Sequence, residues 1–417
     1  MENAILKHNS HWNNPYKNIH KRNKLEYILD RIHLKQIHVL TGIRRSGKTT
    51  LFKLIINDLI THCDPKSILY INLDDPFFSE LYKNSKSLYK LLELSEKLTS
   101  IKVQYIFFDE IQNVLAWEKF IKSIYDNNIV KKIFVTGSNS SLLDGEYATL
   151  LSGRYIKTQI HPPNFNELLK FKSISNRLEL FSNKTTALKT IDSILEYGSF
   201  FEVIQEKEFK RDIILSYYET IVYKDCIANN NLRDSKSFKE LLYFYISNST
   251  NLYSYNSISK NIGINDNTVK EYINTIIDSF ICCEIKQFSY SLKQQIKHKK
   301  KSYVVDNSFL AQISFRFSKD TGKLFENLVF TELYKKYSEI YFISTDTECD
   351  FICKHNDEII AIQVCYDLHS QNLAKEFKGL QKLQIKCKEK VIITYNQSEE
   401  IIDDILVIPF WDYFSEF

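Results

Sequence analysis

Glycine is scarce in this sequence: its 417 residues include nine glycines, six prolines and one methionine. An average protein has about 7% glycine, so we expect each remaining glycine to occupy a position where the backbone needs it. No stretch reaches the roughly 18 uncharged apolar residues of a membrane span, and no apolar segment at the N-terminus precedes small residues. We therefore expect a cytoplasmic protein with no membrane partner.

The eight cysteines form no CxxC pair and no Cys/His cluster at zinc spacing. This favours reduced, mostly buried thiols and a fold that needs no disulfide or metal support. A chain of this length usually forms two or three domains, and its 44% hydrophobic residues are enough to bury their cores. The net charge of +4 permits nucleic-acid binding without arguing for it over the whole chain.

The most specific motif lies near the N-terminus, where an apolar run at 36–41 predicts a buried strand. Residues 42–49 then match GxxxxGK[ST], directly ahead of a helical pattern. In such a loop the backbone N–H groups surround phosphates, the lysine reaches the β- and γ-phosphates, and the hydroxyl completes a Mg²⁺ ligand set. The sequence therefore predicts ATP and Mg²⁺ as cofactors. The predicted cofactor-binding residues are Gly42, Ile43, Arg44, Arg45, Ser46, Gly47, Lys48, Thr49 and Thr50, with Thr49 and Asp109 as metal ligands.

Further apolar runs at 67–75, 103–110 and 132–138 alternate with helical patterns. Such alternation predicts a parallel sheet covered by helices. The second of these runs ends in Asp109 and Glu110. Asp109 can hold Mg²⁺, and Glu110 can orient or deprotonate the attacking water.

Two other features complete the predicted catalytic set. Ser138 and Asn139 lie at the end of the apolar run at 132–138 and suit a sensor of the γ-phosphate or the lytic water. Arg154 can supply a cation for the transition state, in the same chain or across a subunit interface, although its position fits an ordinary surface arginine equally well. The predicted catalytic residues are Glu110, Asp109, Lys48, Arg154, Ser138 and Asn139.

A helix-turn-helix pattern occupies residues 255–273, with its tight turn at Gly263. A basic stretch follows, since no acid lies between Glu284 and Asp306. This stretch is interpreted as a wing that contacts DNA phosphates; a solvated hairpin whose lysines protect an edge strand and a winged helix that binds protein are the alternatives. The predicted DNA-binding residues are Asn267, Thr268, Lys270, Lys293, Lys297, Lys299, Lys300 and Lys301.

The last hundred residues predict a small α/β module that resembles the PD-(D/E)XK nuclease fold, with Glu326 on a helix and Asp350 at the start of a strand. In that fold the aspartate and a second acid bind a divalent metal, and a lysine follows the second acid by two residues. Here Gln363 stands in place of the second acid and Cys365 in place of the lysine. We therefore expect Glu326, Asp350 and Gln363 to form a nuclease-like remnant with a structural or DNA-docking role, because a nuclease would need Asp350 to work without its usual partners.

The chain resembles a family of bacterial and archaeal AAA-type P-loop ATPases. The resemblance rests on the order of the segments GIRRSGKTT, YINLDD, FFDEIQN with Trp117-Glu118, VTGSNSSLL, LSGR and YGSFFEVI, and on His11-Trp12 ahead of them. In that family the ATPase domain precedes a region of unknown function that contains a winged helix and a nuclease-like module. The resemblance implies an ATPase core that oligomerises, and it favours Arg154 as an arginine finger.

The sequence thus predicts an α/β multidomain protein: an AAA-type P-loop ATPase domain at 1–205, a helical and winged-helix domain at 206–315, and a nuclease-like α/β domain at 316–417. The predicted function is a Mg²⁺-dependent ATPase that assembles into a homo-oligomer on branched or double-stranded DNA and couples hydrolysis to DNA remodelling or translocation. The alternative is an ATP-dependent regulatory switch that acts through a protein partner or promoter DNA. Turnover stimulated by DNA would favour the first, and slow turnover with retained nucleotide the second.

Overall fold

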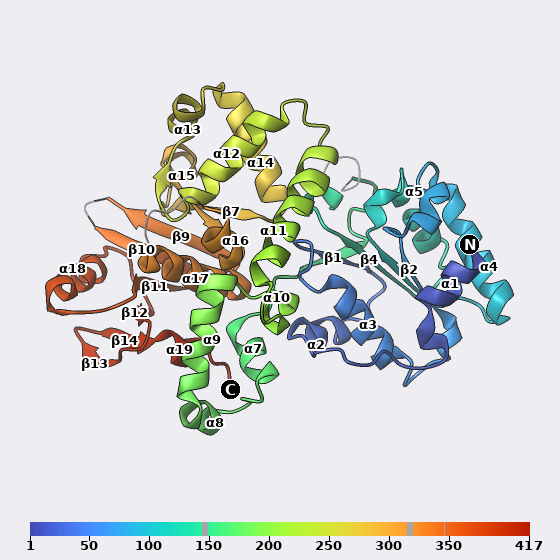
Figure 1. Ribbon diagram of the computed structural model, residues 1–417, viewed down its shortest axis with the longest axis horizontal. Coiled ribbons are helices and arrows are strands. Elements are labelled where there is room, and N and C mark those ends of the chain that lie inside the picture. The colour runs from blue at the N-terminus through green and yellow to red at the C-terminus, as the bar shows by residue number, and fades with distance from the viewer. Residues whose placement is uncertain (144–148, 315–319, 346) are drawn as a thin grey trace. The chain divides into compact units, whose positions relative to one another are not determined.

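The computed structural model describes residues 1–143, 149–314, 320–345 and 347–417. The chain forms two compact units, Met1–His161 and Pro162–Phe417, which run from blue to green and from green to red in Figure 1. All eight cysteines are free thiols, and six of them are buried. Across the described ranges, no helix combines the length and the apolar character needed to cross a membrane.

The first unit is built on a five-stranded sheet of order β2-β3-β4-β1-β5, in which every neighbouring pair is parallel. Its strands are β1 (Ile37–Thr41), β2 (Ile68–Asn72), β3 (Tyr105–Asp109), β4 (Lys132–Gly137) and β5 (Tyr155–Gln159). The parallel sheet expected from the alternation of apolar runs is confirmed. The fifth strand was not predicted, because its sequence YIKTQ mixes polar and apolar residues at an edge of the sheet.

Helices cover both faces of this sheet (Figure 1). One face carries α2 (Lys24–Leu29) and α3 (Lys48–Leu59); the other carries α1 (Glu2–His8), α4 (Leu88–Thr99) and α5 (Trp117–Asp126). The strands are therefore apolar on both sides: Phe107 faces α3, whereas Phe108 faces α5. Because all five strands are parallel, their carboxyl ends lie at one edge, where the P-loop follows β1 and the acids follow β3.

The second unit contains a mixed nine-stranded sheet of order β13-β14-β12-β11-β10-β9-β7-β8-β6. Its strands are β6 (Leu252–Tyr253), β7 (Cys282–Gln287), β8 (Lys300–Val304), β9 (Glu339–Ser344), β10 (Glu348–His355), β11 (Glu358–Cys365), β12 (Glu389–Thr394), β13 (Glu399–Ile402) and β14 (Ile405–Pro409). Its first helices are α7 (Phe165–Phe171), α8 (Arg177–Ser182), α9 (Lys184–Tyr197), α10 (Phe201–Gln205) and α11 (Lys210–Thr220), which the π-helix Ile221–Ala228 extends. The later helices are α12 (Ser235–Ser247), α13 (Tyr255–Ile262), α14 (Asp266–Asp278), α15 (Leu292–Lys297), α16 (Asn307–Gln312), α17 (Thr321–Lys336), α18 (Ser370–Gln381) and α19 (Phe410–Tyr413).

The division into units differs from the domain boundaries expected at 205 and 315. Helix α9 packs against α16 and α17, and Ser199 donates hydrogen bonds from its N–H and its hydroxyl to Asp306 Oδ2, at 2.9 and 2.8 Å. Residues 162–205 thus belong to the second unit. The expected boundary at 315 lies within one sheet, because β7 pairs in parallel with β9 through Lys286 and Tyr341.

Candidate nucleotide site

The two glycines of the P-loop occupy positions that no other residue fits. Gly42 has φ = +143°, and a Cβ there would lie 2.1 Å from the carbonyl oxygen of Ile160. Gly47 has φ = +98°, and a Cβ there would lie 2.2 Å from Arg22 Nη1. The Lys48 ammonium lies within the loop, where it donates to the carbonyl oxygens of Gly42 at 2.8 Å and Ile43 at 3.2 Å. This backbone has the curled conformation that phosphate binding requires.

Arg22 holds the loop in place, a role that no sequence pattern indicated. Its buried guanidinium donates from Nη1 to the Ser46 carbonyl at 2.6 Å and from Nη2 to the His161 carbonyl at 2.8 Å. The arginine thus joins the P-loop to the residue that follows β5. A single arginine in a polar segment 24 residues before Ser46 carries no motif that would reveal such a contact.

Asp109 lies directly beside the P-loop hydroxyl. Its Oδ2 accepts hydrogen bonds from Thr49 Oγ1 at 2.5 Å and from the Tyr70 hydroxyl at 3.3 Å, while its Oδ1 accepts one from the Thr136 hydroxyl. Burial and the neighbouring charge of Glu110 raise the pKa of Asp109, against the hydrogen bonds from Thr136 and Thr49. Oxygen ligands of this kind are those that Mg²⁺ prefers, so the Thr49 and Asp109 side chains fit the predicted metal.

Glu110 is held by its backbone and by its side chain. It has φ = +55°, a region that non-glycine residues adopt at a cost of about 1–3 kcal/mol. Its N–H donates to Thr136 Oγ1 at 2.9 Å, and its carboxylate accepts a hydrogen bond from Gln112 Nε2 at 2.5 Å. The same amide group lies 3.5 Å from Ser138 Oγ. The Gln112 amide therefore lies between Glu110 and Ser138, and Asn139, the next residue, is buried. The sequence patterns did not single out Gln112 or Thr136.

Arg154 lies at the amino ends of the strands, whereas the P-loop lies at their carboxyl ends. It directly precedes β5; its carbonyl accepts from the N–H of Ile37 at 2.8 Å, and its Nε donates to Asp126 Oδ1 at 2.9 Å. A five-residue strand such as β1 spans about 16 Å, so the Arg154 guanidinium lies far from the P-loop of its own chain. A role across a subunit interface stays a prediction, and the pair with Asp126 fits an ordinary surface arginine equally well. Arg44, whose direction the sequence did not give, pairs with Asp74 at 3.6 Å.

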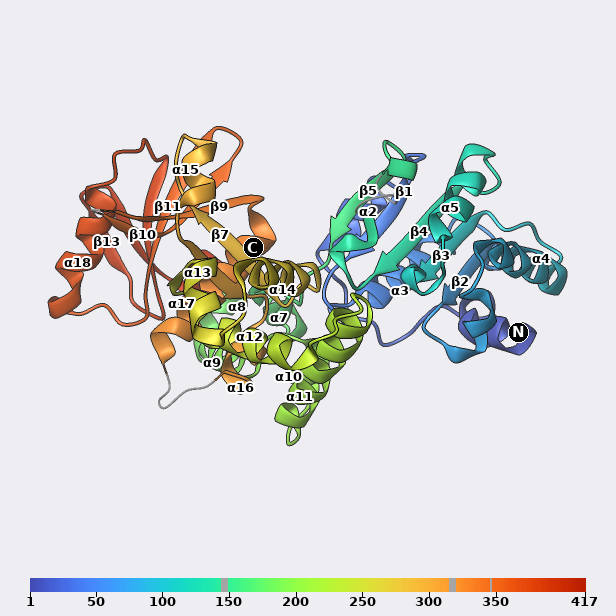
Figure 2. The ribbon, with the colours of Figure 1, turned by 90° about the horizontal axis from the view of Figure 1, so that it is seen from above.

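The predicted helix-turn-helix is formed by α13 and α14, which pack together beside α12 (Figure 2). Gly263 ends α13 in the left-handed conformation. As expected, Asn267 and Lys270 are exposed and Thr268 is partly exposed, whereas Val269 is fully buried together with Ile273 and Ile276. Within this unit, the polar face of α14 is therefore exposed and could contact a partner molecule.

The basic stretch divides into exposed and neutralised lysines. Lys293, Lys297 and Lys299 are exposed, as expected for a surface that contacts phosphates. Lys300 instead donates to Glu284 Oε1 at 2.6 Å and to the Tyr255 hydroxyl at 2.6 Å. Lys301 is 6% exposed. The prediction that these last two residues contact DNA is corrected, because both lie on β8 within the sheet and pair with acids of their own unit.

Lys301, Glu326 and Asp350 form a buried cluster that we call the lysine–carboxylate cluster. Lys301 Nζ lies 3.3 Å from Glu326 Oε1 and 3.4 Å from Asp350 Oδ1, and Glu326 also accepts a hydrogen bond from the Tyr303 hydroxyl at 2.7 Å. Burial and the nearby Asp350 raise the pKa of Glu326 to about 7. Burial opposes the charge of Lys301, but the two carboxylates outweigh it and raise the pKa of the ammonium. A buried cation therefore does lie beside Glu326 and Asp350, although it comes from β8 and not from position 365.

Gln363 joins this cluster to a third acid. Its Oε1 accepts from the N–H of Asp350 at 3.3 Å, and its Nε2 donates to Glu376 Oε2 at 2.9 Å. The three residues of the expected remnant, Glu326, Asp350 and Gln363, are therefore brought together. Even so, no set of three or more His, Cys, Asp or Glu side chains in the described parts of the chain is arranged to hold a metal ion.

Comparisons with known proteins identify the P-loop region of the chain and match the rest to domains of unknown function. Residues 34–169 match an AAA domain, residues 188–320 match a domain of unknown function (DUF8612), and residues 321–413 match another (DUF4143). The uncharacterized protein MJ1544 of Methanocaldococcus jannaschii is 33% identical over 402 residues, which cover 90% of this chain and 87% of the relative. The chain belongs to the family of MJ1544.

A second member, an uncharacterized protein of Haemophilus influenzae, is 29% identical over 405 residues, 94% of this chain and 97% of the relative. Among solved structures, the Aeropyrum pernix ORC1 protein in complex with DNA covers 73% of this chain and 94% of its own, at 11% identity and a TM-score of 0.32, too low to bear on function. The AAA domain together with its P-loop makes this family one of P-loop AAA-type ATPases.

Proposed function

We propose that this protein is a Mg²⁺-dependent ATPase that binds DNA and couples hydrolysis to DNA remodelling or translocation as an oligomer. The observation that carries the ATPase proposal is the contact of Thr49 Oγ1 with Asp109 Oδ2 at 2.5 Å, which joins the P-loop to the end of β3. These two residues would hold Mg²⁺, which when bound neutralises charge on the phosphate oxygens.

The remaining side chains have separate tasks at this edge of the sheet. Lys48 would exchange the carbonyl oxygens of Gly42 and Ile43 for the β- and γ-phosphates of ATP. Glu110 would orient the attacking water and take its proton, after its carboxylate leaves the Gln112 amide. Ser138 lies near the same amide and would report the state of the γ-phosphate.

The proposal for DNA binding rests on the second unit. Helices α12 to α14 with strands β6, β7 and β8 have the order of a winged helix, in which α14 would enter the major groove. Its exposed Asn267 and Lys270 would face the bases, and Lys293, Lys297 and Lys299 would contact phosphates. The lysine–carboxylate cluster, in which both acids pair with Lys301 and no third acid completes a metal site among the described residues, supports a docking or structural role of the last module rather than hydrolysis of DNA.

An oligomer is proposed because Arg154 lies away from the P-loop of its own chain, from where it could act on the nucleotide of a neighbouring subunit. The alternative function is a regulatory switch. One observation favours it: the hydrogen bond from Gln112 occupies the Glu110 carboxylate, so turnover would stay slow until a partner releases the acid.

The first test is steady-state ATP hydrolysis with Mg²⁺, alone and with duplex, single-stranded or four-way-junction DNA, with Lys48→Ala as the blank. The proposal predicts that one DNA form stimulates turnover. Turnover that is indifferent to all three forms would favour the switch.

A variant of the wing locates the DNA contact. The triple change Lys293→Ala, Lys297→Ala and Lys299→Ala should weaken DNA binding and reduce its salt slope, since about one counterion is released per phosphate contact. The matched control changes three exposed lysines of the last module, Lys375, Lys378 and Lys382, to alanine. Equal losses in both variants would contradict the assignment of the wing.

A further inference from the structure

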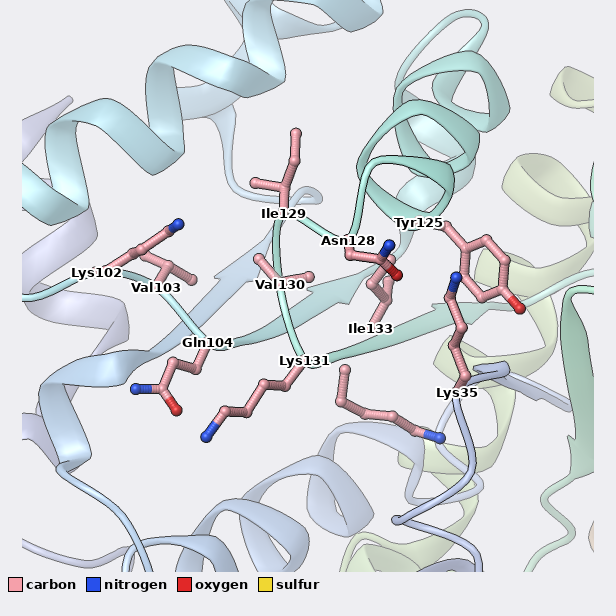
Figure 3. Close-up of a pocket in the computed structure, with 11 residues that line it drawn as sticks. Lys35, Lys102, Val103, Gln104, Tyr125, Asn128, Ile129, Val130, Lys131 and Ile133 are labelled. Carbon is pink, nitrogen blue, oxygen red and sulfur yellow. The ribbon is translucent and has the colours of Figure 1, made fainter.

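A cavity of about 440 Å³ lies in the first unit at the amino ends of β3 and β4 (Figure 3). Lys35 reaches it from the segment before β1, Lys102 from the segment before β3, and Lys131 from the segment before β4. Because the strands are parallel, this edge of the sheet is opposite the edge that carries the P-loop. The cavity therefore does not belong to the nucleotide site.

The lining of this basic cavity carries one sign of charge. Its eleven residues include Lys35, Lys102, Lys131 and Lys132 but no aspartate or glutamate. Within the described residues none of these four lysines lies within ion-pair distance of a carboxylate. The nearby Asp126 pairs with Arg154 at 2.9 Å, and the charge of Lys35 also contributes to lowering the pKa of Asp126. The basic stretch of the second unit differs in this respect, because two of its lysines are neutralised.

Lys132 makes this imbalance costly. The residue is 2% exposed, and its ammonium donates to the Leu34 carbonyl at 2.5 Å and reaches the Arg31 carbonyl at 3.5 Å. Burial lowers its pKa to about 8. A buried ammonium without a carboxylate partner is unfavourable, and an anion in the cavity would offset that cost.

Part of the lining is also held in place: the ammonium groups of Lys35 and Lys132, and the backbone at Lys131. The Lys35 ammonium lies 4.6 Å from the centre of the Tyr125 ring, and Figure 3 shows the two side chains next to each other. The carbonyl of Gln104 accepts from the N–H groups of Lys131 at 2.8 Å and Lys132 at 3.2 Å. The backbone and the Lys35 and Lys132 side chains would then need little further ordering when a ligand binds.

We infer that the basic cavity binds phosphate groups, carried by a free polyphosphate or by a nucleic-acid strand. Lysines are point-charge ligands of phosphate, and the side-chain amides of Gln104 and Asn128 add donors to the same lining. The volume is within the range of small-molecule sites, about 300–1,000 Å³, so it admits a group of up to nucleotide size. Strands β3 and β4 begin at this cavity and end at Asp109 and next to Ser138, so the ligand would contact segments that continue into the proposed ATPase site.

The test uses the full chain with Lys48→Ala, so that phosphates do not bind at the P-loop and the result is independent of ATP hydrolysis. Binding of tripolyphosphate is measured by calorimetry, and binding of a labelled single-stranded oligonucleotide by anisotropy. The variant carries Lys35→Gln, Lys102→Gln and Lys131→Gln. All three residues are exposed, so folding should be unaffected. The control carries the same change at Lys83, Lys86 and Lys90, exposed lysines of the same unit outside the cavity.

The expected result is a loss of tenfold or more in tripolyphosphate affinity in the cavity variant and no loss in the control. Competition between the two probes, with a salt slope for the oligonucleotide reduced by about 2 in the cavity variant, would identify a strand as the source of the phosphates. Tripolyphosphate binding without competition would identify a free polyphosphate. Equal affinities in the two variants, or no binding of either probe to the parent chain, would overturn the inference.

Discussion

Thr136 positions both acids of the proposed ATPase site, and replacing it with valine tests that geometry with almost no change in shape. Its hydroxyl donates to Asp109 Oδ1 and accepts from the N–H of Glu110 at 2.9 Å, in a position that is fully buried. A hydrogen bond to a charged group contributes about 1.5–3 kcal/mol and a neutral one about 1 kcal/mol. Thr136→Val should therefore lower the free energy of unfolding by about 2.5–4 kcal/mol.

The effect on turnover should be larger than the effect on ATP binding. Without its anchor, the Glu110 carboxylate would shift, and a displacement of about 1 Å can cost about 100-fold in rate. Loss of the Thr136 donor would also raise the pKa of Asp109 further above its usual range. Asp109 must be ionised to hold Mg²⁺, so turnover should increase as the pH rises through the pKa of Asp109. In the valine variant this increase should occur at a higher pH than in the wild type.

The assay compares Thr136→Val with Thr136→Ser, which keeps the hydroxyl. Urea unfolding gives the stability, fluorescent-nucleotide binding gives the affinity, and steady-state hydrolysis from pH 6 to pH 9 gives the profile. The serine variant should resemble the wild type in all three. Wild-type turnover and pH profile in the valine variant would refute the role assigned to Thr136.

Three further predictions follow from buried charges. Burial, with the nearby Lys132 and Arg31, lowers the pKa of His38 to about 4 from an ordinary 6.5, so its contribution to stability is complete above pH 6.5 and is lost as the pH falls toward 4. Between pH 7 and pH 5, the decrease in the free energy of unfolding should be about 2 kcal/mol smaller in His38→Phe than in the wild type, as measured by urea unfolding. An equal decrease in the two proteins would contradict this. Lys301→Met should destabilise the chain by about 3–5 kcal/mol, and adding Glu326→Gln and Asp350→Asn should restore most of it, whereas a stable single variant would contradict the pairing. Arg22→Ala should weaken ATP binding, and Arg22→Lys, whose ammonium cannot span both carbonyls, should recover only part of the affinity; equal dissociation constants in all three proteins would remove Arg22 from the site.

Sequence patterns predicted the elements whose signals are local. The P-loop, the first four strands of the sheet and the helix-turn-helix each depend on residues within about 20 positions of one another. The acids at the end of β3 could be assigned to the P-loop because parallel strands align their carboxyl ends. Thr136 was within reach of the same reasoning, since it precedes the predicted Ser138 by two residues.

Contacts between distant segments could not be predicted. Arg22 reaches His161, 139 residues away, and nothing in its local sequence shows that its guanidinium is buried. Lys301 was assigned to DNA because it closes a run of lysines, yet the register of β8 directs its side chain to Glu326 and Asp350. Arg154 was assigned to the nucleotide by motif order, although the chain returns to the other edge of the sheet before β5 begins.

The central claim, that Glu110 acts on water at an ATP site formed by the P-loop and Asp109, is tested most directly by comparing the wild type with Glu110→Gln and Lys48→Ala. ATP binding and Mg²⁺-dependent turnover are measured in the same preparations. The account predicts that Glu110→Gln binds ATP but does not hydrolyse it, and that Lys48→Ala does neither. Full turnover by Glu110→Gln would contradict it.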